Sequence, residues 1–194
     1  LEPNIMKQAK VLTEKEFKRA LAICETMQNG KRNRLMLLLS HYAGLRVGEI
    51  ASLKWKDVLD RDLKPKPMFY LKAENTKAKE ARQVHLNARM QRELTTYWAQ
   101  LHKWKKPELP VIESQKGGSF TGNSLVQAFG RIFHAAGIED ASSHSGRRWF
   151  ITKLAHSGIS PKVIMELAGH KQLTTTQRYI DVTDEQKRNA VEVL

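Results

Sequence analysis

The sequence predicts a mainly α-helical domain with one small antiparallel β-sheet, which is an α+β fold class. Apolar residues recur at helical spacing over most of the 194 residues, and capping signals stand before several of these stretches. Between residues 54 and 86 that spacing is lost, and two short strand-like segments flank a polar loop. An apolar content of 41% in a chain of this length is enough for one globular domain with its own core.

The N-terminal part is expected to be helical. Thr13 and Glu16 form a capping box, in which each side chain bonds the backbone N–H of the other residue. A helix is therefore predicted over residues 13–28, and Asn29-Gly30 ends it. Further helices are predicted over 31–43 and 46–53, with a break at Gly44 between them.

The sheet is predicted as a hairpin of two strands. Met68–Leu71 and Arg82–Leu86 have strand character, and the polar stretch 73–80 between them is expected to be the hairpin loop. Pro65 and Pro67 break any helix before the first strand. The remaining elements are a short extended piece at Val111-Ile112 and helices over 88–104, 122–136, 145–157, 160–168, 174–180 and 183–192.

The chain is strongly basic, with 33 Lys and Arg against 20 Asp and Glu and a formal net charge of +13. A domain with this charge is expected to bind a polyanion, and nucleic acid is the first candidate. The single cysteine, Cys24, excludes an internal disulfide, is expected in the core and suits a reducing cytoplasm. No apolar run is long enough to span a bilayer and no signal-peptide pattern is present, so no membrane partner is expected.

Phosphoryl transfer without a metal ion needs a nucleophile, cations for the non-bridging oxygens and an acid for the leaving oxygen. Arg46 stands where a helix is predicted to begin after Gly44, so its guanidinium adds to a positive helix N-terminus. Glu49 lies one turn later and can orient a neighbouring cation or the backbone. An ordinary Arg–Glu pair on the helix surface explains the same spacing.

Lysines and a His–Arg pair supply further candidates. Lys77 and Lys79 lie in the predicted hairpin loop, from which a lysine can donate a proton to a departing oxygen, although loop lysines are often only solubilising. His144 and Arg147 stand three residues apart at the start of a predicted helix, so their side chains are expected to face the same way and bind phosphate. A simple helix cap with a surface charge is the alternative. Arg148 points to another face and is assigned to the DNA backbone or to packing.

Tyr179 is the candidate nucleophile. Gly169 indicates a turn that exposes His170, and Tyr179 follows on a predicted short helix capped by Thr174 or Thr175. A phenol with an ordinary pKa near 10 is a poor nucleophile, so nearby cations must stabilise its phenolate form. Half-buried amphipathic packing is the usual role of a lone tyrosine, and it remains the alternative.

Four segments that contain these residues occur in the order of a known family. They read GLRVGEIASLKWKDV, TKAKEARQVHL, HSGRRWFITKLAHSG and LAGHKQLTTTQRYI, and the match extends from about residue 12 to Tyr179. Through them the chain resembles the tyrosine recombinases, which form the phage integrase family. The resemblance implies the catalytic-domain fold of that family.

The resemblance also implies that the chain cleaves and rejoins DNA without metal, ATP or any other cofactor. In the family a tyrosine attacks the scissile phosphate, forms a 3′-phosphotyrosyl link and releases a 5′-hydroxyl; the 5′-hydroxyl of a partner strand then reverses the step. By position, the resemblance implies Tyr179 as nucleophile, Arg46 and Arg147 on the non-bridging oxygens, Lys77 as general acid with Lys79 as its rival, His144 and His170 in proton transfer, and Glu49 as a supporting acidic residue.

The partner that the resemblance implies is double-stranded DNA at specific recombination sites. A homotetramer is expected to assemble on that DNA from monomers in solution, in the cytoplasm of a bacterium or a phage host. The residues expected to bind the DNA outside the catalytic set are Lys79, Arg82, Arg148 and Arg178.

Residues 13–182 are expected to form the catalytic domain, residues 1–12 an N-terminal extension and residues 183–194 a C-terminal helix or tail. Most family members carry a helical core-binding domain before the catalytic domain. The chain is therefore expected to be either an excised catalytic domain or a compact single-domain relative. In relatives the C-terminal helix docks onto a neighbouring protomer, and folding back onto its own domain is the alternative here.

Three positions depart from the usual pattern of the family. Gly146 and Arg148 stand where a leucine and a histidine are more common, and His85 stands where the second strand usually has a proline. None of these positions carries a catalytic side chain, so activity is expected.

Other functions stay open from the residues alone. A metal-dependent nuclease needs clustered carboxylates, and the nearest cluster is Asp57, Asp60 and Asp62, without a second acidic motif. A DNA-binding regulator without catalysis has the same charge but no need of Tyr179. A type IB topoisomerase shares the chemistry and relaxes DNA without strand exchange between two duplexes.

Overall fold

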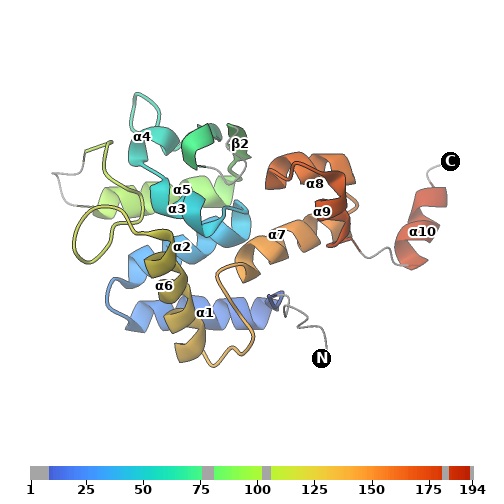
Figure 1. The fold of residues 1–194 in the computed structure, drawn as a ribbon, viewed down its shortest axis with the longest axis horizontal. Coiled ribbons are helices and arrows are strands. Elements are labelled where there is room, and N and C mark those ends of the chain that lie inside the picture. The colour runs from blue at the N-terminus through green and yellow to red at the C-terminus, as the bar shows by residue number, and fades with distance from the viewer. Residues whose placement is uncertain (1–8, 76–80, 102–105, 181–183, 193–194) are drawn as a thin grey trace, which may run out of the picture.

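The computed structural model describes residues 9–75, 81–101, 106–180 and 184–192. Helices dominate them, and one two-stranded antiparallel sheet completes the fold, so the predicted fold class is confirmed (Figure 1). The elements are α1 (Glu14–Thr26), α2 (Gly30–Tyr42), α3 (Val47–Ser52), α4 (Trp55–Val58), β1 (Met68–Leu71), η1 (Ala73–Asn75), β2 (Arg82–His85), α5 (Ala88–Gln100), α6 (Gly122–Ala135), α7 (Ser145–His156), α8 (Pro161–Ala168), α9 (Leu173–Gln177) and α10 (Asp184–Val191).

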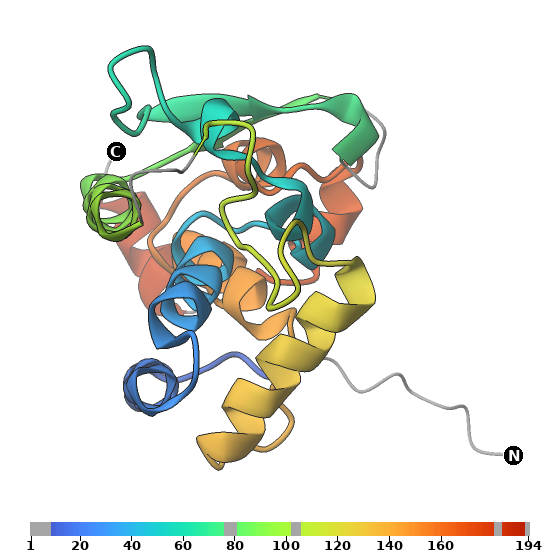
Figure 2. The ribbon, with the colours of Figure 1, turned by 90° about the vertical axis from the view of Figure 1, so that its left-hand side faces the viewer.

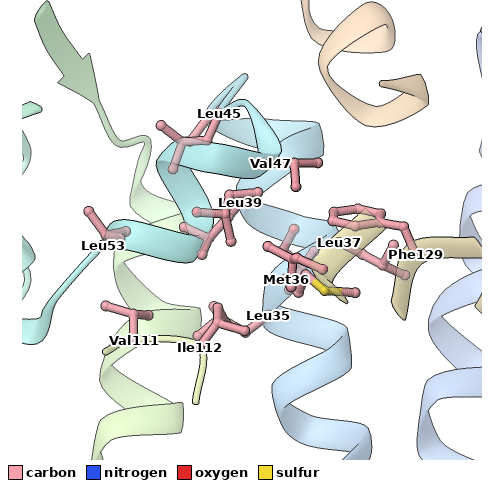
Figure 3. Close-up of a cluster of buried hydrophobic side chains, with 14 of the residues drawn as sticks. Leu35, Met36, Leu37, Leu39, Leu45, Val47, Leu53, Val111, Ile112 and Phe129 are labelled. Carbon is pink, nitrogen blue, oxygen red and sulfur yellow. The ribbon is translucent and has the colours of Figure 1, made fainter. Parts of the chain in front are cut away.

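Helix α2 is the centre of the core. Its residues 35–41 are all buried, and it packs against α1, α3, α5, α6 and α7. A helix that is apolar on every side is stable only when other elements surround it. Figure 3 shows how Leu37 of α2 approaches Phe129 of α6, while Leu35 lies near Ile112 of the loop before α6. The predicted burial of Cys24 is confirmed.

The hairpin presents one face to this core. Met68 pairs with His85 and Leu71 pairs with Arg82, in an antiparallel register. Phe69, Leu71 and Val84 are buried, whereas Tyr70, Gln83 and His85 between and beside them are exposed, as the alternation of side chains in a strand requires. The strands run along one side of the helical body, and α1 and α6 lie on the opposite side (Figure 2). The hairpin thereby brings Arg82 next to α8.

Helix α7 joins the main body to a smaller unit formed with α8 and α9 (Figure 1). A second apolar cluster fills this unit, with Phe150, Leu154, Tyr179 and Ile180 packed against it. Its fully buried members are Ile151, Ala155, Ile164 and Ala168. Helix α10 stands apart from the other helices in Figure 1, and its described side chains are exposed.

Most helix predictions are confirmed to within a few residues, and three differ. Helix α4 and the 3₁₀ turn η1 were not predicted, because elements of three or four residues are too short to show a helical period. Helix α9 ends at Gln177, so the prediction that Tyr179 lies within a helix is wrong. Its N-cap is Gln172, without a side-chain bond, rather than Thr174 or Thr175.

Two further observations bear on the ends of the chain and on membranes. Leu12, which the sequence assigned to an N-terminal extension, is 2% exposed and belongs to the main core. In the part of the chain that the structure describes, no helix has both the length and the apolar character that a membrane span requires.

Helices α2 and α7 approach closely at Gly146, which explains the absence of the more common leucine. A Cβ atom built on Gly146 would lie 2.7 Å from Ser40 Oγ and 3.1 Å from the backbone N of His41. Gly146→Ala should therefore lower the free energy of unfolding by about 1–3 kcal/mol, the usual cost of overpacking. Gly130→Ala, inside α6 with nothing within 4 Å of its Cβ position, should raise it by up to about 1 kcal/mol. Urea denaturation measures both, and equal effects would contradict the close approach.

The imidazole of His41 is stacked between Phe17 and Trp149, with ring centroids 3.6 Å and 3.7 Å away. Burial, with a smaller contribution from the charge of Arg89, lowers its pKa from 6.5 to about 3. The unfolded chain therefore binds a proton below pH 6.5 that the folded chain does not bind, and stability falls as the pH drops towards 3.

Replacing His41 should reduce this acid sensitivity. In His41→Phe the ring stack is kept but nothing titrates, so the variant should lose less stability than the parent chain between pH 7.5 and 5.5. The difference should reach about 1.4 kcal/mol per pH unit below 6.5. Urea denaturation at the two pH values measures it. Equal losses in the two proteins would show that His41 is not held neutral.

Candidate active site

Three arginines meet at the C-terminus of α8. The helix ends at Gly169, whose φ of 61° turns the chain and leaves the last carbonyls of the helix without helical partners. These carbonyls carry the negative end of the helix dipole, which favours cations. The bonds run from Arg82 Nη1 to Leu167 O (2.8 Å), from Arg147 Nη2 to Ala168 O (2.5 Å) and from Arg46 Nη2 to Gly169 O (2.9 Å).

Glu49 is the carboxylate that balances this group. It is 1% exposed and forms ion pairs with Arg46 at 2.9 Å and with Arg82 at 2.7 Å. Burial alone would raise the pKa of Glu49, but the hydrogen bonds and charges of Arg82 and Arg46 outweigh it and hold the pKa below its ordinary value. Glu49 also accepts from the backbone N of Arg46 at 2.8 Å, which caps α3. The Arg46–Glu49 pair is therefore internal rather than an ordinary surface pair.

Arg147 lies in the first turn of α7 and is 6% exposed. Besides Ala168 O, it donates to Gly44 O at 2.6 Å, in the turn that precedes α3. Burial, followed by the positive charges of Arg46 and Arg82, lowers its pKa to about 9, so it remains protonated at neutral pH. An anion bound beside it would reduce the cost of burying this charge.

His144 is the residue that caps the N-terminus of α7. Its side chain is exposed, whereas that of Arg147 is buried, so the two predicted partners lie at different depths. Lys77 and Lys79, the two candidates for the general acid, fall outside the described residues.

His170 follows the Gly169 turn directly. Its Nδ1 lies 2.8 Å from the hydroxyl of Thr176, which is fully buried in α9. Burial and the charges of Arg147, Arg46 and Arg82 lower the pKa of His170 to about 4, so the imidazole is neutral at pH 7. A neutral imidazole can accept a proton, which is the form required of a general base.

Tyr179 lies just beyond the end of α9. Its backbone N–H donates to Thr176 O at 3.0 Å, and its ring centroid lies 6.0 Å from that of His170. The guanidinium of Arg148 lies over the ring of Tyr179, with its Cζ 5.6 Å from the ring centroid. The ring is half-buried against the second apolar cluster. Tyr179 therefore packs against that cluster and also lies near His170.

The residues that the sequence assigned to DNA contacts differ in their surroundings. Arg82 is 9% exposed, and its guanidinium donates three hydrogen bonds to Glu49 and Leu167. Arg148 is half-buried beside Tyr179, and Arg178 is exposed at the end of α9. The role of Arg82 could not be read from its sequence position, because its partners lie 33 and 85 residues away.

The arrangement forms a frame for an anion. Three guanidinium groups against one carboxylate leave two positive charges without a protein counter-charge among the described residues. Arg46 and Arg147 each use two side-chain donors on protein oxygens, and their other N–H groups have no protein acceptor in that part of the chain. Guanidinium groups match phosphate oxygens in geometry and charge. No group of three or more His, Cys, Asp or Glu side chains able to hold a metal ion occurs among the described residues.

Known proteins share this sequence pattern and fold. The sequence matches the phage integrase family over residues 10–186. The tyrosine recombinase XerA of Thermococcus kodakarensis is 32% identical over 184 residues, which cover 94% of this chain and 62% of the relative. Transposase A from transposon Tn554 of Staphylococcus aureus is 28% identical over 192 residues, which cover 94% of this chain and 52% of the relative.

The fold also resembles a solved structure of the Tn1549 transposon integrase in complex with a circular intermediate DNA. The TM-score is 0.78 at 18% identity, and the match covers 99% of this chain and 68% of that one. At this identity the likeness concerns the fold. The chain thus spans between half and two thirds of the length of its curated relatives. Because the family match covers nearly the whole sequence and includes every element that builds the arginine frame, the chain belongs to the phage integrase family.

Proposed function

We propose that the chain cuts and rejoins DNA strands at specific sites through a 3′-phosphotyrosyl link to Tyr179. The observation that carries this proposal is the frame of Arg46 and Arg147, with unused donors beside His170 and Tyr179. Family membership supports it, and so do the names of the relatives, which are a tyrosine recombinase, a transposase and an integrase bound to DNA.

The first step is an in-line displacement at phosphorus. The phenolate oxygen of Tyr179 forms a bond to the scissile phosphorus as the bond to the 5′-oxygen breaks. The neutral imidazole of His170 can take the phenol proton, and Lys77 supplies a proton to the departing 5′-oxygen. The 5′-hydroxyl of a second strand then attacks the phosphotyrosyl bond and restores Tyr179. The number of phosphodiester bonds is unchanged, so the cycle needs neither ATP nor a metal ion.

The arginines act on the charge that develops during the displacement. Arg46 is held by Glu49 and Gly169 O, and Arg147 by Gly44 O and Ala168 O, so little reorganisation is needed when the negative charge grows. In this proposal His144, which is exposed at the start of α7, adds a contact to the phosphate.

Strand exchange requires more than one protomer on the DNA. We propose a tetramer on double-stranded DNA that assembles from monomers in the cytoplasm, with α10 docking onto a neighbouring protomer. Two features support this: α10 stands apart from its own domain in Figure 1, and the chain carries a net charge of +13. The exposed Arg178, next to Tyr179 in the sequence, suits a contact to the DNA backbone.

Replacing the nucleophile should separate binding from chemistry. We expect the parent chain, incubated in EDTA with nicked duplexes of randomised sequence, to form a complex with DNA that resists denaturation by detergent. Tyr179→Phe should bind the duplexes with unchanged affinity and form no such complex, because the attacking oxygen is missing. A trapped complex of the variant, seen as a shifted band on a denaturing gel, would show that another residue attacks.

Replacing Arg147 should affect the rate far more than the affinity. Arg147→Ala is expected to slow adduct formation by about 100-fold or more, as loss of one preorganised donor does, while the dissociation constant changes little. Single-turnover cleavage and gel-shift titration on the sites recovered by trapping measure the two quantities. Arg92→Ala, an exposed change on α5, is the control for lost charge. Equal losses of rate and affinity in Arg147→Ala would contradict a role in the transition state.

A further inference from the structure

Arg82 connects three elements of the site. It is the first residue of β2, and its side chain reaches Glu49 of α3 and the last turn of α8. Its Nε and Nη2 donate to the two oxygens of Glu49 at 3.1 Å and 2.7 Å, and its Nη1 donates to Leu167 O at 2.8 Å. This two-pronged contact with a carboxylate requires the planar fork of a guanidinium, which lysine lacks.

Arg82 and Arg46 share the same carboxylate. The Glu49 oxygen that accepts from Arg82 Nε also accepts from Arg46 Nη1, and the other accepts from the backbone N of Arg46. With Arg82 removed, Glu49 would keep its burial but lose two of its four hydrogen bonds. Arg46 and Arg82 thus share one anchor, and the contact of Arg46 with Glu49 is expected to loosen when Arg82 is removed.

The Gly169 turn is shaped around the side chain of Arg82. A Cβ atom built on Gly169 would overlap Cδ of Arg82 and lie 3.0 Å from its Nε. The methylene part of Arg82 thus runs against the backbone of the residue that precedes His170. Any side chain at position 169 must displace Arg82 or move the turn.

We infer that Arg82 is a positioning residue for cleavage, which fixes α3, β2 and the C-terminus of α8 in one frame. This inference rests on the proposed function, because cleavage is the step that the frame serves. It also separates Arg82 from the DNA contacts, since a phosphate contact would act on affinity.

The first test compares Arg82→Gln and Arg82→Lys with the parent chain, on duplexes recovered by trapping. We expect Arg82→Gln to slow single-turnover cleavage by about 100-fold, with the dissociation constant and its salt dependence unchanged. Arg82→Lys should recover little of the rate, because an ammonium cannot hold both Glu49 oxygens. If instead affinity falls and the slope of log K against log salt drops by about 1, Arg82 contacts phosphate and the inference is wrong.

The pH profile distinguishes positioning from a general loss of structure. In Arg82→Gln the buried Glu49 loses a main cause of its lowered pKa and is expected to take up a proton in mildly acidic solution. The cleavage rate of the variant, relative to the parent chain, should then fall further at pH 6 than at pH 8. An equal ratio at both pH values would mean that Arg82 does not act through Glu49.

A matched glycine pair keeps the test decisive even if Arg82→Gln folds poorly. Gly169→Ala and Gly137→Ala introduce the same side chain at φ values of 61° and 60°, but only position 169 lies against Arg82, and nothing lies within 4 Å of the Cβ position at 137. Gly169→Ala should slow cleavage as Arg82→Gln does, whereas Gly137→Ala should cleave like the parent chain.

Two outcomes would contradict different parts of this account. Equal cleavage by the two alanine variants would overturn the inference. If the parent chain itself forms no covalent complex with DNA, the proposed function fails, whatever the variants do.

Discussion

The structure depends on the C-terminus of α8, where three arginines are held close together although their charges repel. Only Glu49 opposes them as a carboxylate among the described residues, and it is buried between two of them. The consecutive carbonyls of residues 167–169 supply the remaining attraction, one for each guanidinium. Because the helix dipole concentrates negative charge at this end, the protein holds three guanidinium groups in one place.

The convergence of the arginines at α8 also depends on how the helices and the hairpin pack. Arg147 can be buried only because α7 packs closely on α2, which requires Gly146, and because the turn at Gly44 offers its carbonyl. Arg82 reaches the last turn of α8 because β2 contacts that helix and Gly169 leaves room for the side chain. The packing of the domain therefore determines the geometry of the site, because glycines at close contacts leave room for the arginine side chains.

Much of this could be predicted from the sequence, where the signals are local. The cap at Thr13 and the Arg46–Glu49 contact can be predicted from the sequence, since each joins residues within one turn of helix. The ordered motifs also indicated the family. The role of Arg82 and the convergence on α8 could not be predicted, because those bonds join residues 33 to 123 positions apart. The position of Tyr179 beyond the end of α9 was missed, since threonine-rich sequence gives no sharp helix end.

We propose that the arginine frame presents a phosphate to the phenol of Tyr179. Peptide mapping of a purified protein–DNA adduct by mass spectrometry tests it most directly. The account predicts a nucleotide joined through its 3′-phosphate to the peptide that contains Tyr179. A nucleotide on any other residue, or cleaved DNA that carries no protein, would contradict it.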